Sequence, residues 1–149
     1  MEYVYLAVKH AHSGVRWAVL ILLVLAIGNA LGKRNGGTVY PAKNKLGLYA
    51  LIATHVQLLL GLVLYLFLSP KVSFESGAMS NHIIRFFTSV HIFGMVIGII
   101  LVTVGYSKAK RQAGINKGWK TIALFYTLGL LVILASIPWP FQKYGAGWF

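Results

Sequence analysis

The stretch LGLYALIATHVQLLLGLVLYLFL, residues 46–68, contains no Asp, Glu, Lys or Arg and decides the fold class. A helix needs roughly 20 apolar residues to cross about 30 Å of hydrocarbon, and this run is long enough. A helix also pairs its own backbone N–H and C=O groups, which a lipid environment demands. We therefore predict a transmembrane helix over residues 46–68.

Three further apolar runs accompany it, at about residues 3–31, 83–106 and 121–137, and Pro138 and Pro140 end the last. Of the 149 residues, 58% are apolar and only 11% are charged, with a mean hydropathy of +0.73. Lipid rather than water must therefore surround most of the protein. The sequence predicts an all-α membrane protein with four transmembrane helices.

The basic residues behind the net charge of +12 predict the topology. Two of the three connecting segments are basic, with Lys33, Arg34, Lys43 and Lys45 in the first and Lys108, Lys110, Arg111, Lys117 and Lys120 in the third. The opposite side carries only Lys9, Lys71 and Lys143. The positive-inside rule then predicts a bacterial inner-membrane protein with both termini on the periplasmic side.

The connecting segments are short, so residues 1–149 are expected to form one domain, an antiparallel four-helix bundle in the lipid bilayer. No basic face remains outside the loops, which argues against a nucleic-acid partner. Cysteine is absent, and the only acidic residues, Glu2 and Glu75, lie outside the membrane core. This composition excludes thiolate sites, paired-carboxylate catalysis and a serine triad. The classes of function that remain are redox chemistry, metal handling and assembly with other proteins.

Of the five histidines, at least three lie within the apolar runs, namely His12, His55 and His91. At 1.5 Å per residue, each is expected about 15–20 Å below the outer surface, so the three can lie at one depth. Arg16 and Arg85 also fall within the runs, with no carboxylate beside them in the chain. Polar groups at membrane depth usually face the bundle interior. A lipid, a cofactor or a partner subunit must therefore supply the negative charge.

A haem group would satisfy these residues, because it needs two imidazoles from facing helices and cations for its propionates. His91 with either His55 or His12 is the expected axial pair, and Arg16 or Arg85 the expected propionate partner.

Gly94 and Gly98 follow His91 by three and seven residues and share its helix face. They predict either room for a flat macrocycle or close helix packing.

Two alternatives stay open at this point. His12, His55 and His91 together would suit copper or zinc. A non-catalytic accessory subunit, bound to lipid or to a larger membrane complex, would also fit the basic loops.

Five segments carry a resemblance to a known family: His12-Ser13-Gly14-Val15-Arg16-Trp17, His55-Val56-Gln57, Arg85 with His91, Gly105–Arg111, and Ile137-Pro138-Trp139-Pro140-Phe141. They resemble, over the full length, small four-helix membrane proteins of Bacteroidetes-type bacteria labelled cytochrome b or cytochrome b561-like. The resemblance implies b-type haem in inner-membrane electron transfer, with a quinol pool or a respiratory complex as partner. His12, His55 and His91 are the matching histidines.

Overall fold

The computed structural model describes residues 2–148, and every regular element within that range is helical. Nine elements follow one another: α1 (Glu2–Lys33), α2 (Lys45–Val63), η1 (Leu64–Leu68), η2 (Ala78–Ser80), α3 (His82–Arg85), η3 (Phe86–His91), α4 (Ile92–Lys110), α5 (Lys117–Ser136) and η4 (Pro140–Gln142). The elements η1 and η3 are π-helical turns that continue the neighbouring α-helices, whereas η2 and η4 are short 3₁₀ turns.

Four continuous helices result within the described residues, each long and apolar enough to cross a membrane: Glu2–Lys33, Lys45–Leu68, His82–Lys110 and Lys117–Ser136. Even the shortest has 20 residues, which gives about 30 Å of helix, the thickness of the hydrocarbon core. The prediction of an all-helical chain with four such helices is confirmed.

The largest differences from the predicted boundaries lie in the third and fourth helices. The third and fourth helices extend past the expected residues 106 and 121, because Lys108, Lys110 and Lys117 lie in their terminal turns. Long basic side chains can cover the apolar end of a helix while their charges stay in water, so these turns remain helical. The fourth helix ends one residue early, since Ile137 is extended (φ −72°, ψ 131°). The ring of Pro138 disfavours the helical conformation at the residue before it.

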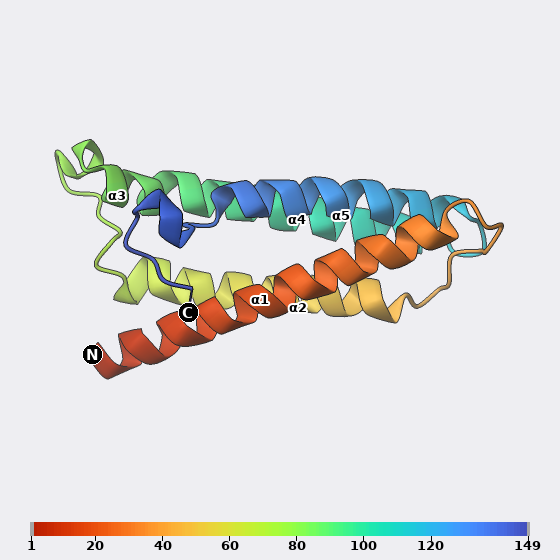
Figure 1. Ribbon diagram of the computed structural model, residues 1–149, viewed down its shortest axis with the longest axis horizontal. Helices are drawn as coiled ribbons and strands as arrows, with labels where there is room; N and C mark the ends of the chain where they lie inside the picture. The colour runs from red at the N-terminus through yellow and green to blue at the C-terminus, as the bar shows by residue number, and fades with distance from the viewer. Residues whose placement is uncertain (1, 149) are drawn as a thin grey trace.

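The four helices run alternately up and down, and they pack as two hairpins (Figure 1). One hairpin joins α1 to α2, and the other joins α4 to α5. The hairpins meet near the connecting segments 34–44 and 111–116, which we call the basic end. Toward the opposite end, where both termini lie, α1 diverges from the α4/α5 pair (Figure 1). We call this the terminal end.

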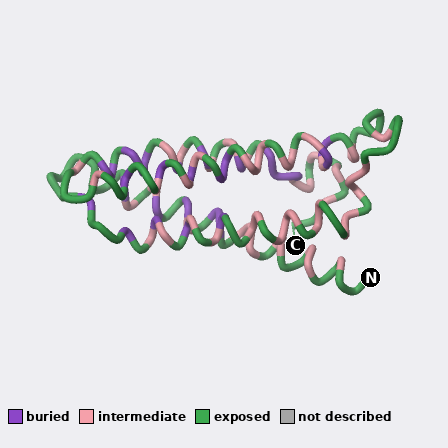
Figure 2. The backbone as a smooth tube through the Cα atoms, turned by 180° about the vertical axis from the view of Figure 1, so that it is seen from behind, coloured by how far each residue is buried: buried purple, intermediate pink, exposed green. Residues whose placement is uncertain are grey.

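The basic end is held together by contacts between its two connecting segments. The backbone N–H of Tyr40 donates to Ile115 O at 3.2 Å, and that of Gly114 donates to Tyr40 O at 2.9 Å. The Tyr40 ring packs edge-on against Trp119, with ring centres 4.9 Å apart, and both side chains are almost fully buried. Burial also raises the pKa of the Tyr40 hydroxyl. Many of the buried residues lie in this half of the bundle, drawn in purple in Figure 2.

Glycines form the contact between α4 and α5. A Cβ at Gly94 would overlap the Ser136 side chain, and a Cβ at Gly98 would lie 2.6 Å from Ile133 Cγ1 and 3.2 Å from Gly129 O. Both glycines therefore face α5 and let the two backbones approach, as small residues do in membrane helix pairs. The expectation that they leave room for a macrocycle is corrected, because α5 already occupies that space.

Candidate functional site

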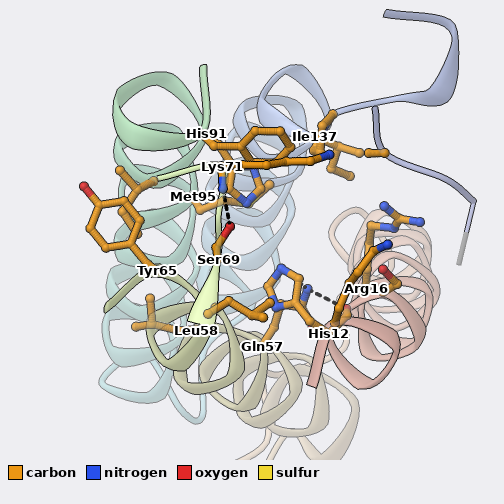
Figure 3. A pocket seen from close by; sticks show the side chains of 18 of the residues that line it. His12, Arg16, Gln57, Leu58, Tyr65, Ser69, Lys71, His91, Met95 and Ile137 are labelled. Carbon is orange, nitrogen blue, oxygen red and sulfur yellow. Dashed lines mark hydrogen bonds between the residues drawn. The ribbon is translucent and has the colours of Figure 1, made fainter. Parts of the chain in front are cut away.

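A cavity of about 150 Å³ opens at the terminal end, where the two hairpins diverge. Its lining side chains come from all the long helices and from the segments that follow η1 and α5, and Figure 3 draws most of them. It is far larger than the ~10–15 Å³ that one water molecule needs. The cavity is therefore a candidate binding site.

Two of the predicted histidines line this cavity and approach each other across it. The ring centres of His12, on α1, and His91, at the end of η3, lie 6.4 Å apart with the ring planes inclined at 73°. A metal ion lies about 2 Å from each imidazole nitrogen it binds, so two rings on one ion have centres roughly 6 Å apart. The observed separation matches that requirement.

The end of α5 fixes the orientation of His91. Its Nδ1–H donates to the backbone oxygen of Ser136 at 2.8 Å. This carbonyl belongs to the last residue of α5 and is free because Ile137 and Pro138 end the helix. Since Nδ1 carries the proton, the neutral ring has its lone pair on Nε2, the arrangement usual for a metal-ligating histidine.

His12 is held mainly by α2. The Gln57 side-chain amide donates to His12 O at 2.9 Å and also to His12 Nε2 at 3.2 Å. Gly61 provides the room, because a Cβ there would lie only 3.1 Å from His12 Cε1. A metal at Nε2 would replace the longer Gln57 hydrogen bond, at a net cost of about 0.5–1.5 kcal/mol.

Several polar atoms of the lining have no partner among the described residues. They are His12 Nδ1, Arg16 Nε and Gln57 Oε1, all buried. Each such atom costs about 1–3 kcal/mol when nothing binds to it. The arrangement is therefore that of a site for a polar or charged ligand.

Three cations line the cavity, and no acidic residue is found among its described lining residues. They are Lys9, Arg16 and Lys71. Burial, together with the nearby charge of Lys9, lowers the pKa of Lys71. A ligand with negative charge would relieve this repulsion.

The C-terminal segment, residues 137–148, covers part of the cavity and uses its backbone carbonyls to bind two of the cations. Lys71 Nζ donates to Gly145 O at 2.5 Å and to Tyr144 O at 3.2 Å. Arg16 Nη2 donates to Trp148 O at 2.5 Å. Carbonyl dipoles thus partly replace the absent carboxylates.

Stability is expected to depend on the Lys71 charge. Folding lowers the pKa of Lys71 below the ordinary lysine value of about 10.4. At a pH between these two values, the unfolded chain binds more protons than the folded chain. The free energy of unfolding therefore rises with pH in that interval. We expect Lys71→Gln to flatten this rise. Thermal unfolding in detergent from pH 8 to pH 10.5 measures it, with Lys143→Gln as the control. Equal slopes in wild type and Lys71→Gln would contradict the expectation.

The other predicted site residues lie elsewhere. His55 is exposed on the outside of the bundle, on α2. Arg85 is exposed and does not line the cavity, so its expected role beside a propionate is not supported by its position. No group of three or more His, Asp, Glu or Cys residues suited to a metal ion occurs among residues 2–148. The structure brings His12, His91 and Arg16 together, and it does not bring His55 to them.

Sequence reasoning missed several residues of the cavity. Lys71 lies in a connecting segment and showed no signal beyond its charge. Tyr65, in η1, donates its hydroxyl to Thr88 O at 2.8 Å and so joins the two π-helical turns. Gln57 was detectable as a polar residue within an apolar run, and its position on the helix opposite His55 followed from their spacing of two residues.

Comparisons of this chain with protein-family models, with curated proteins and with solved structures each give no match.

Proposed function

We propose that this chain is a membrane electron-transfer protein of the b-type cytochrome class that holds one haem between His12 and His91. The observation that carries the proposal is the 6.4 Å separation of the two imidazole rings across a cationic cavity. The two histidines come from facing helices, each long and apolar enough to cross a membrane. The family resemblance of the sequence supports the same function.

Each part of the cavity has a role in this proposal. His12 and His91 would hold the haem iron, with Ser136 O orienting His91. Arg16, Lys9 and Lys71 supply the positive charge that haem propionates require. When bound, the haem provides a reversible one-electron iron couple. Quinol or a respiratory complex would be its electron partner.

The donor set fits the group in number, separation and charge, but the free volume is small. About 150 Å³ is less than the roughly 300–1,000 Å³ of usual small-molecule sites. Lining side chains such as Met95 and Arg16 must therefore move when the haem enters. The divergence of the two hairpins at this end makes that movement less costly than it would be in the packed core.

A bare metal ion is the second candidate, and the small volume favours it. Zinc usually takes three or four protein ligands, whereas only two histidines meet here. Copper bound by the two imidazoles is therefore the form of this alternative that the site allows.

The test is a reduced-minus-oxidised absorption spectrum of protein expressed with haem supplementation, combined with a pyridine haemochrome assay and metal analysis. We expect a b-type α-band and about one haem per chain. A colourless protein that contains stoichiometric copper would favour the second candidate. A colourless protein with neither iron nor copper would overturn both.

A further inference from the structure

The last six described residues, 143–148, cover part of the cavity that His12 and His91 line, and we call them the strap. In Figure 1 the chain runs here from the end of α5 toward α1, and residues 145–147 line the cavity directly. Within residues 2–148, no backbone-to-backbone hydrogen bond involves residues 144–148. Side chains of other elements therefore hold the strap in place, not regular secondary structure.

Two cations of the cavity lining make most of the hydrogen bonds to the strap. Lys71 Nζ donates to Tyr144 O at 3.2 Å and to Gly145 O at 2.5 Å. Arg16 Nη2 donates to Trp148 O at 2.5 Å. A carbonyl oxygen carries only a partial negative charge, so an anion is a stronger acceptor for the same two cations. The strap and an anionic ligand would thus compete for Lys71 and Arg16.

Aromatic rings hold the strap at two further points. Trp148 stacks on Trp17 with ring centres 6.3 Å apart, and Tyr144 stacks on Phe86 with ring centres 3.9 Å apart. Such ring contacts are individually weaker than hydrogen bonds to a charged group. Lys71 and Arg16 therefore contribute most to keeping the strap closed.

The size and lining of the cavity define the ligand that would compete with the strap. The free volume of about 150 Å³ is below the roughly 300–1,000 Å³ of usual small-molecule sites. The strap belongs to no helix, so it can move without disturbing the packing of the bundle. Apart from the cations, much of the lining is apolar, with Val19, Leu58, Ile92, Met95, Ile99 and Ile133. Its complement is an apolar molecule with an anionic group.

We propose that the strap is a displaceable lid over the cavity. The anionic group of an amphiphilic ligand takes Lys71 and Arg16 from the strap carbonyls, and residues 143–148 move away as the apolar body enters. Because the two events are linked, a change that loosens the strap also tightens ligand binding. That haem is this ligand rests on the proposed function, whereas the displacement itself does not.

The experiment measures the position of the strap with two spin labels. The chain has no cysteine, so Leu124→Cys on α5 and Gly147→Cys on the strap, both at exposed positions, take the only labels. Double electron–electron resonance is recorded in nanodiscs of phosphatidylcholine, which has no net charge. The probes are laurate and protoporphyrin IX, each compared with its uncharged methyl ester.

We expect laurate to shift the distance distribution to longer values. Methyl laurate should need at least a roughly tenfold higher concentration for half of this shift, because it cannot make the charge-assisted hydrogen bonds. Protoporphyrin IX should act as laurate does if haem is the ligand. The label pair Leu124→Cys with Phe141→Cys is the control, because Phe141 lies in η4 outside the strap, and its distances should not change.

Three variants in the labelled background sharpen the result. Trp148→Ala removes the stacking on Trp17 and should lower the laurate concentration for half-opening about two- to tenfold, as expected for the loss of a ring contact. The double variant Arg16→Met with Lys71→Met should open the strap without any ligand, since methionine cannot donate. Lys143→Gln changes a strap cation that does not line the cavity and should leave the half-opening concentration unchanged.

An unchanged distance distribution at saturating laurate, or an equal response to methyl laurate, would overturn the proposal. So would a higher half-opening concentration in Trp148→Ala, because the strap would then hold the ligand instead of competing with it. A response to laurate without a response to protoporphyrin IX would keep the strap assignment while removing haem as the ligand. The failure of this proposal and that of the proposed function are thus distinguishable.

Discussion

Replacing His91 by alanine is expected to remove bound haem almost completely from the purified protein. His91 has its Nδ1–H fixed on Ser136 O, and its Nε2 lone pair is left for the cavity. Loss of the residues that merely orient a metal ligand already weakens binding 10–100-fold. Loss of the ligand itself should leave less than about one tenth of the wild-type haem content, and His12→Ala should have the same effect.

The matched control is His55→Ala, which removes a third histidine at membrane depth from the outside of the bundle. The haem-to-protein ratio of each variant is measured by pyridine haemochrome assay, alongside size-exclusion profiles that report folding. We expect His55→Ala to keep its haem. Loss of haem in His55→Ala with retention in His12→Ala would refute the assignment of the axial pair.

Replacing Gly98 by leucine is expected to destabilise the bundle by about 3 kcal/mol or more, the upper range for overpacking. The new side chain would meet Ile133 and the backbone oxygen of Gly129. The Gly129 carbonyl cannot turn aside without breaking α5, so the two helices must separate. The free energy of unfolding, measured by SDS titration in mixed micelles, should fall accordingly.

Gly28→Leu provides the control for this prediction. Gly28 and Gly32 repeat the spacing of Gly94 and Gly98, but nothing lies within 4 Å of a Cβ at either position. Because leucine favours helix over glycine by up to about 1 kcal/mol, Gly28→Leu should be neutral or stabilising. Equal destabilisation by both substitutions would show that the α4/α5 contact is not what makes Gly98 intolerant.

The shape of the bundle connects these predictions to function. The glycine contacts between α4 and α5 pack these two helices tightly, and the buried side chains of Tyr40 and Trp119 pack the basic end. The cavity lies where this packing gives way and the hairpins diverge. Rigid packing thus borders a site whose lining must adjust to its ligand, a common division between scaffold and binding region.

The number of helices and their approximate limits follow from the sequence alone. Length and hydropathy decide this, because lipid leaves the chain no other way to pair its backbone. Pro138 ended the fourth helix as predicted within one residue. Sequence also predicts one common depth for His12, His55 and His91, since depth along a span depends only on the rise along a single helix.

Which of these residues meet depends on how the helices pack against one another. Spacing along one helix fixes which side chains share a face, but not how that face is turned toward the next helix. The packing of α2 directs Gln57 inward to His12 and leaves His55 exposed, although the two residues are only two positions apart. The contact of α4 with α5 places Gly94 and Gly98 against α5 instead of the cavity. Lys71 reaches the site from a connecting segment, where no helical periodicity exists to predict its position.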